Sequence, residues 1–195
     1  MSVTTQKAPL EKLLAWLRAK HVRPLVSGRV VLDFGCGANA WAARSLQPLC
    51  KRIDGLEPTL STGIVHGIKI VSALEQLQEN DYEVVIALAV FEHLHPHVLR
   101  QVLQQLHVIT MPDAVIAGTV PTPLARPMLE FLSYRLGLID PSQIRDHKVY
   151  YDDLWLGELL RGSHWRIRQY NTFQLGMNSF FVLDKLPALS AKAMQ

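Results

Sequence analysis

The feature that most constrains the fold is a segment in which a short apolar run leads into an acid and two glycines. Its residues are Val30-Val31-Leu32-Asp33-Phe34-Gly35-Cys36-Gly37-Ala38-Asn39. A short apolar run bounded by turn residues predicts a buried strand. Glycines that follow such a strand let the backbone approach a ligand that a Cβ atom would exclude. The segment therefore predicts a strand followed directly by a ligand-binding turn.

Apolar strands and helical patterns alternate along the rest of the chain. We expect strands at 29–34, 52–56, 68–71, 82–88, 114–120, 165–173 and 179–183. We expect helices at 9–20, 40–47 and 95–109, a short helix at 74–77, and a helix from residue 152 or 153 to about 161. This alternation predicts an α/β fold with a parallel sheet and helices on both faces. Open sheets of this kind bind ligands beyond the carboxyl ends of their strands.

Two classes of ligand are compatible with the glycine turn. Gly35, Gly37 and Ala40 match the dinucleotide pattern G-x-G-x-x-G/A. Glu57 stands at about the ~20-residue offset of its ribose-binding acid. A dinucleotide pyrophosphate is anionic, however, and Asp33 just before the turn would repel it. The sulfonium and ammonium groups of S-adenosylmethionine (SAM) would instead be attracted by this acid.

Two motifs resemble those of the class I SAM-dependent methyltransferases. Residues 30–39 resemble motif I, and residues 81–94 resemble motif IV of the small-molecule branch, which ends in Glu-His-Leu. Asn39 replaces the usual third glycine of motif I, and asparagine tolerates left-handed backbone better than most residues. The resemblance implies a Rossmann-like, mostly parallel sheet of seven strands in the order 3-2-1-4-5-7-6, with the last strand antiparallel. It also implies SAM as cofactor and S-adenosylhomocysteine as product.

The same resemblance implies cofactor-binding residues at the ends of four strands. They are Asp33, Phe34, Gly35, Cys36, Gly37, Ala38, Glu57, Pro58, Ser72, Ala73, Leu88 and Ala89. Asp33 would meet the methionine end of SAM, and Glu57 would accept hydrogen bonds from both ribose hydroxyls. Ser72 stands where the family often has an aspartate that reaches the adenine amine. We therefore expect the adenine contact to come mainly from backbone and packing.

Histidines are the candidate catalytic residues. His147 lies in the pattern Asp-His-Lys-x-Tyr, where it could act as a general base or hold its loop through Asp146. His93 is the second candidate because it follows the fourth expected strand, at 82–88, and so lies near the ligand-binding edge of the sheet. Histidines also alternate over 93–97, but alternation by two shares a face only in a strand, and this stretch leads into a helix. With Glu92 the only carboxylate nearby and no cysteine, we expect no metal site.

An insertion at about 121–150 is expected to hold the acceptor and to form a lid. Residues 124–138 are apolar around most of a helix, so they predict contact with an apolar part of the acceptor, a second copy in a homodimer, or a peripheral membrane surface. Residues 139–151 and 175–182 resemble methyltransferases encoded with cell-surface polysaccharide genes. That implies O-methylation of a sugar, glycolipid or polysaccharide precursor. A small natural product or metabolite, methylated on oxygen or nitrogen, and a non-catalytic scaffold remain the alternatives.

Composition bounds the remaining classes. The chain has 195 residues, of which 49% are hydrophobic and 19% charged, so residues 1–195 are expected to form a single globular domain. A net charge of +3 without a Lys/Arg run gives no indication of a nucleic-acid partner. Two cysteines, Cys36 and Cys50, and a start that lacks the signal-peptide pattern predict the reducing cytoplasm. No apolar run is long enough for a membrane span.

Overall fold

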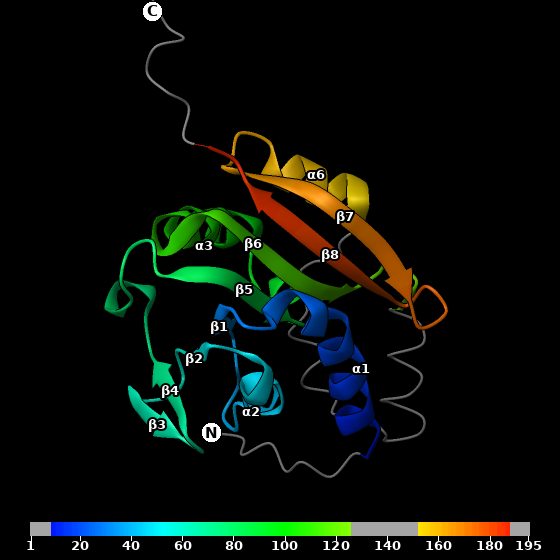
Figure 1. Cartoon of the computed structure of the whole chain (residues 1–195). Helices are drawn as coiled ribbons and strands as arrows, with labels where there is room; N and C mark the ends of the chain where they lie inside the picture. Colours follow the sequence, from blue (N-terminus) through cyan, green and yellow to red (C-terminus); the bar gives the residue numbers. More distant parts are fainter. Residues whose placement is uncertain (1–8, 126–151, 188–195) are drawn as a thin grey trace, which may run out of the picture.

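The structure is a computed structural model that describes residues 9–125 and 152–187. Its strands are β1 (Val30–Phe34), β2 (Arg52–Leu56), β3 (Gly63–Val65), β4 (Ile68–Val71), β5 (Tyr82–Leu88), β6 (Thr110–Pro121), β7 (Trp165–Phe173) and β8 (Asn178–Lys185). Its α-helices are α1 (Pro9–Val26), α2 (Trp41–Leu46), α3 (Pro96–Ile109) and α6 (Asp153–Leu160) (Figure 1). Short 3₁₀ turns lie at η1 (Gln47–Leu49), η2 (Leu74–Gln76) and η3 (Phe91–His93).

One sheet of eight strands runs in the order β3-β4-β2-β1-β5-β6-β8-β7. The strands from β4 to β6 in this order pair in parallel, and β8 is antiparallel to both β6 and β7. This confirms the predicted α/β class, the mostly parallel sheet and the antiparallel last strand. Without β3, the order of the strands is the predicted one.

The edge strand β3 corrects the predicted count of seven strands. It pairs antiparallel with β4 through a tight hairpin in which His66 and Gly67 have positive φ angles of 50° and 83°. Two central residues of positive φ are typical of the hairpin turn that matches strand twist. The strand has only three residues, one of them Gly63, and they are exposed or half-buried. No hydrophobic alternation therefore marks it in the sequence.

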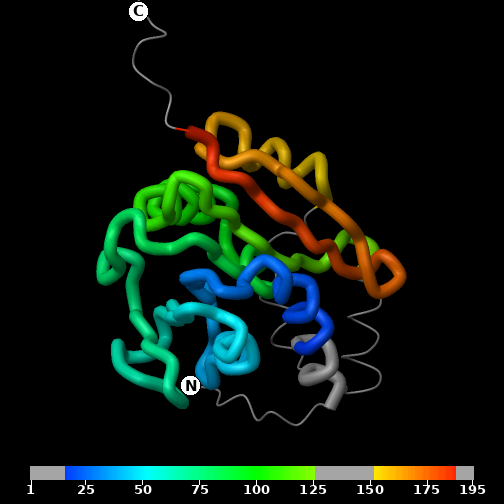
Figure 2. Tube along the Cα trace, viewed as in Figure 1, coloured from blue at the N-terminus to red at the C-terminus, as the bar shows by residue number. Residues whose placement is uncertain are grey.

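Helices cover both faces of the sheet (Figures 1 and 2). On one face, Val22 and Val26 of α1 pack with Ala43 and Leu46 of α2 against the strands. On the other face, apolar side chains of α3 and α6 complete a second core: Leu99, Leu103, Leu106, Ile109, Leu156, Leu159 and Leu160. Within the described ranges, no helix combines the length and hydropathy needed to cross a bilayer.

Strand β8 was expected at 179–183 and runs from Asn178 to Lys185, and two other elements extend further beyond their predicted bounds. Helix α1 was expected at 9–20 but continues to Val26, with Pro24 inside its last turns. Strand β6 begins at Thr110 instead of residue 114, with a shift of register opposite Tyr82 and Val84. Pro112 removes a backbone donor there, so the early part of the strand lacks the usual sequence signal.

Candidate functional site

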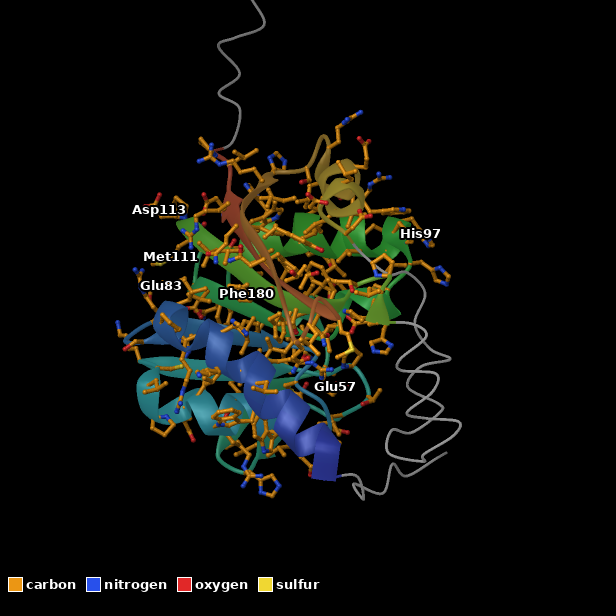
Figure 3. All side chains as sticks on the ribbon, turned by 90° about the vertical axis from the view of Figure 1, so that its right-hand side faces the viewer. Glu57, Glu83, His97, Met111, Asp113 and Phe180 are labelled. Carbon is orange, nitrogen blue, oxygen red and sulfur yellow. The ribbon has the colours of Figure 1, made fainter. Side chains whose placement is uncertain are left out.

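The parallel strands bring the predicted site residues to one edge of the sheet. Asp33 lies near the end of β1, Glu57 follows β2, and Leu88 ends β5. In Figure 3, Glu57 lies on the opposite side of the molecule from Glu83 and Asp113, which lie near the amino ends of β5 and β6. The structure therefore brings the strand-end residues to the edge where open α/β sheets bind ligands.

The turn after β1 needs glycine for two reasons. Gly35 and Gly37 have φ angles of 74° and 68°, a left-handed conformation that side chains disfavour. A Cβ atom on Gly35 would also lie 2.7 Å from Cγ2 of Val90. The next left-handed residue is Ala40, with φ of 44°, so the conformation that we associated with Asn39 falls one residue later.

Asp33 is a buried acid at the floor of this edge. Its side chain is 2% exposed, and its Oδ2 accepts a hydrogen bond from the backbone N–H of Ala43 at 3.0 Å. Burial raises the pKa of Asp33 to about 7; the Ala43 N–H opposes this rise and the charge of Glu57 adds to it. The carboxylate is therefore costly to ionise when the site holds no cation, and a bound cation would favour ionisation.

A pocket of about 150 Å³ opens above Asp33. Its walls come from α1, β1, the glycine turn, α2 and β5, and they comprise Arg18, Asp33, Gly35, Cys36, Trp41, Ala42 and Leu88. The pocket thus combines one guanidinium group with one carboxyl group. Glu92 is a second buried acid, 1% exposed, which does not line the pocket but interacts with the charge of Arg18. Burial raises the pKa of Glu92 to about 7, and the charge of Arg18 opposes this rise.

Glu57 connects the glycine turn to the end of β2. Its Oε2 accepts a hydrogen bond from the N–H of Gly37 at 3.0 Å. Its Oε1 accepts from the N–H and the hydroxyl of Thr59, at 3.1 and 2.7 Å. Each carboxylate oxygen can accept more than one hydrogen bond, and Glu57 is only half-buried. It can therefore hold the turn and still accept hydrogen bonds from a ligand.

Ser72 lies in a polar cluster with two residues that the sequence did not indicate. The Thr62 hydroxyl donates to Oε1 of Gln76 at 2.8 Å, and the N–H of Ser72 donates to the same oxygen at 3.0 Å. Thr62 lies in an irregular loop between the glutamate and the third predicted strand, and no pattern in the sequence places it beside Ser72. The residues that directly follow β4, at 72–73, therefore lie in polar but uncharged surroundings.

The other predicted cofactor residues differ in exposure. Ala89 has a positive φ of 58°, and its N–H donates to the carbonyl of Thr119 at 2.9 Å. Phe34 is 6% exposed and belongs to the hydrophobic core. Cys36 and Ala73 are half-buried, whereas Ala38 and Pro58 are exposed.

Of the two candidate catalytic histidines, His93 lies within the described ranges. His93 is half-buried in η3, and the rings of His95 and His97 stack with centroids 5.8 Å apart. In the two described ranges, no group of three or more His, Cys, Asp or Glu side chains could hold a metal ion. His147 lies outside the described residues, as do 126–151, which include most of the predicted lid and of the apolar segment 124–138.

Arg18 and Trp41 line the pocket but were not predicted as site residues. In the sequence, Arg18 is one of several charges between the leucines of an amphipathic helix, which is the ordinary pattern of a solvated face. Only the packing of α1 beside β5 places Arg18 above the carboxyl end of β1. No local signal in the sequence reports this long-range arrangement.

No protein-family profile and no curated protein sequence matches the chain. Many solved structures do match its fold. The 1,6-didemethyltoxoflavin-N1-methyltransferase of Burkholderia thailandensis, crystallised with 1,6-didemethyltoxoflavin and S-adenosylhomocysteine, has a TM-score of 0.62 at 14% identity over 93% of this chain and 80% of its own. A SAM-dependent methyltransferase of Archaeoglobus fulgidus has a TM-score of 0.63 at 16% identity over 90% of this chain and 94% of its own.

A third similar structure is the pyocyanin biosynthetic protein PhzM. Its TM-score is 0.66 at 11% identity, over 88% of this chain and 55% of its own length. At such identities the likeness concerns the backbone arrangement, which agrees with the strand order and with the glycine turn at the end of β1. The chain has the fold of the class I SAM-dependent methyltransferases.

Proposed function

We propose that this protein is a SAM-dependent methyltransferase that acts on a small-molecule acceptor. The observation that carries the proposal is the pocket in which Arg18 and the buried Asp33 flank the turn at Gly35. The amino-acid end of SAM carries a carboxylate and an ammonium group, and its sulfonium is positive. A guanidinium beside a buried carboxyl group is complementary to this pattern of charge.

Glu57 and the polar cluster around Ser72 fit the rest of the cofactor. A half-buried carboxylate at the end of β2 can accept hydrogen bonds from a pair of ribose hydroxyls. The uncharged groups of Thr62, Ser72 and Gln76 suit the edge of a neutral adenine ring. S-adenosylhomocysteine would keep these contacts after the methyl group has left.

The same residues disfavour a dinucleotide. A pyrophosphate placed at the turn would lie close to the carboxyl groups of Asp33 and Glu57, and the charge of Glu57 already raises the pKa of Asp33. Adding an anion would increase this repulsion, whereas adding a sulfonium would relieve it. The charge at the carboxyl end of β1 thus separates the two ligand classes.

The acceptor is proposed only as a class. One similar protein was crystallised with 1,6-didemethyltoxoflavin, and another is described as a pyocyanin biosynthetic protein, which supports a small organic acceptor. O-methylation of a sugar or glycolipid rests on the sequence patterns of residues 139–151, which lie outside the described residues, and of residues 175–182. Methyl transfer would be a direct displacement at the sulfonium, accelerated mainly by holding donor and acceptor in line.

Calorimetric titration of the purified protein with SAM, S-adenosylhomocysteine and NAD tests the cofactor. We expect the two SAM-type ligands to bind and NAD not to bind. Glu57→Ala should weaken SAM binding by about 1.5–3 kcal/mol, as expected for hydrogen bonds to a charged group. The exposed Glu79→Ala is the matched control and should leave the affinity unchanged. NAD that competes with SAM and binds more tightly would overturn the proposal.

A second experiment identifies the acceptor and separates enzyme from scaffold. The protein is incubated with methyl-labelled SAM and with the water-soluble and lipid fractions of a cell extract. Label in a water-soluble small molecule supports the proposed acceptor class, and label in the lipid fraction supports a glycolipid. SAM binding without labelled product in either fraction would contradict an enzyme for these acceptors and favour the scaffold alternative.

A further inference from the structure

A second cavity, of about 260 Å³, lies between helix α1 and the outer strands β7 and β8. Its lining comprises His21, Pro24, Leu25, Gln169, Asn171, Thr172, Phe173 and Phe180. The lining includes no aspartate, glutamate, lysine or arginine. The volume exceeds the ~150 Å³ of an engineered protein cavity that holds a benzene ring. This cavity is separate from the one above Asp33.

The aromatic side of the cavity comes from three rings on two elements. His21 lies on α1, and its ring centroid is 4.4 Å from that of Phe173 and 5.3 Å from that of Phe180. Phe180 is 5% exposed and belongs to the core below α1, whereas His21 and Phe173 are half-buried. In Figure 3, Phe180 lies on the same side of the sheet as the α1 ribbon. The cavity therefore offers aromatic surface against which a ring can stack.

The polar side comes from the edge strand β7. Gln169, Asn171 and Phe173 alternate along this strand and so share one face of the sheet. Asn171 is paired with Phe180 of β8, which places its amide beside an aromatic ring. Gln169 and Asn171 are both exposed, and among the described residues their side-chain amides make no hydrogen bond to protein, so water solvates them until a ligand replaces it. Each amide offers both donors and an acceptor.

Helix α1 keeps this side of the cavity uncharged. Burial, with a contribution from Lys20, lowers the pKa of His21 below its usual value, so that the imidazole is neutral at neutral pH. The apolar Leu25 lies four residues further along the same helix and lines the same cavity. A charged ligand would find no opposite charge among the lining residues. A flat neutral ligand would find both stacking surface and hydrogen-bonding groups.

We infer that this cavity is a binding site for an uncharged ring compound whose edge carries hydrogen-bonding groups. The ring would lie against Phe173, Phe180 and His21, and its edge would meet the amides of Gln169 and Asn171. A nitrogen heterocycle and the face of a pyranose share this chemistry.

One row of paired strand residues connects this cavity with the pocket above Asp33. Leu88, Thr119, Phe180 and Asn171 are paired across four adjacent strands in one row. Leu88 lines the first pocket, and Phe180 and Asn171 line the second. Two strand spacings, or about 10 Å, separate Leu88 from Phe180. Thr119 lies between them, fully buried, with a hydroxyl that has no hydrogen-bond partner among the described residues.

Nuclear magnetic resonance of the full chain tests this site with two probes. Theophylline, a neutral planar heterocycle, and methyl β-D-glucopyranoside are titrated separately while the side-chain amide signals of Gln169 and Asn171 are recorded. We expect at least one probe to shift these signals with a dissociation constant of about 1 mM or tighter. Binding of theophylline alone assigns the site to heterocycles, and binding of the glucoside alone assigns it to sugars.

A double variant, Gln169→Leu with Asn171→Leu, removes the amides but keeps the size of the side chains. Because the double variant lacks these amide signals, probe binding is compared among the proteins through the signals of the probe itself. The double variant should weaken probe binding by at least about tenfold, whereas Gln104→Leu, at an exposed glutamine on α3, should not change it. All three proteins should bind S-adenosylhomocysteine equally, which reports correct folding. Failure of the homocysteine ligand to bind wild type would count against the proposed function and not against this site.

Two results would overturn the inference. The first is that neither probe shifts the amide signals at concentrations up to about 10 mM, well above the expected dissociation constant. The second is that the double variant binds the probes as tightly as wild type. Either result would leave the pocket above Asp33 unaffected.

Discussion

Two buried aspartates on opposite faces of the sheet differ in what surrounds them. Asp33 of β1 pairs with Gly55 of β2, so the neighbouring Asp54 points to the other face. Asp54, in the middle of β2, is 4% exposed, and its Oδ2 accepts hydrogen bonds from the Tyr82 hydroxyl at 2.8 Å and from Nε of Arg52 at 3.1 Å. Asp33, near the carboxyl end of β1, is 2% exposed, and its Oδ2 accepts a hydrogen bond from the backbone N–H of Ala43. It lies below an open pocket.

From this difference we infer that Asp54 stabilises the fold, whereas Asp33 serves ligand binding. The oxygen of Asp54 is satisfied by protein groups, and Arg52 also pairs with Asp81. Asp33 is left with a pKa raised to about 7, which means that its ionised form is unfavourable until a cation arrives. A buried acid with a raised pKa in a cleft is a candidate for a functional site.

The largest effect is expected at the paired acid. Asp54→Ala leaves the buried Tyr82 hydroxyl and the Arg52 guanidinium without their acceptor, so it should lower the free energy of unfolding by about 3 kcal/mol. Chemical denaturation measures this loss. The exposed Asp113→Ala is the control and should change stability by less than about 0.5 kcal/mol. Equal effects of the two substitutions would show that Asp54 does not stabilise the fold through its contacts with Tyr82 and Arg52.

A smaller effect on stability, of opposite sign, is expected when the buried acids Asp33 and Glu92 are neutralised. The folded-state pKa values of Asp33 and Glu92 are both raised to about 7, above 3.8 and 4.5. Between about pH 4 and 7 the folded protein then binds more protons than the unfolded chain. The free energy of unfolding therefore falls as pH rises through this window. Asp33→Asn with Glu92→Gln should nearly match wild type at about pH 4 or below and exceed its unfolding free energy by at least about 2 kcal/mol near pH 8.

Denaturation of the ligand-free proteins at both pH values measures this difference. The same double substitution is expected to abolish SAM binding, which would show that the acids are retained for the ligand. A variant that is less stable than wild type near pH 8 would contradict the comparison, because it would mean that the ionised acids stabilise the fold.

The smallest effect concerns the chemistry at the carboxyl end. Once an acceptor is known, His147→Asn should lower kcat by about tenfold or more and change SAM affinity by less than about twofold. The reason is that a base contributes to proton removal and not to cofactor binding. The same substitution at His93 is the comparison. If His147→Asn leaves kcat unchanged, His147 is not the base.

The comparison also shows which parts could be predicted from sequence. Asp33 and the glycines after it follow an apolar run, so a local pattern is enough to place them at the end of a buried strand. Glu57 is similarly marked by its place after the second strand. The pairing of Asp54 with Tyr82 has no such mark, because the residues are separated by 28 positions and meet only through sheet register.

Arg18 could not be predicted for the same reason. Its place in the pocket depends on how α1 packs across β5, which no nearby residue reports. The second cavity, too, needs the antiparallel pairing of β7 with β8 to bring Asn171 beside Phe180. Local sequence patterns therefore predict the residues at the strand ends. The other residues that line the two cavities are brought there by tertiary packing, which local patterns do not predict.

The most direct test of the account compares SAM titrations of Asp33→Asn and Asp54→Asn near pH 8. We expect Asp33→Asn to lose SAM affinity by at least about 100-fold, equivalent to about 2.7 kcal/mol, because the cation loses its buried partner. Folded Asp54→Asn should bind SAM within about twofold of wild type. Retention of full SAM affinity by Asp33→Asn would contradict the account.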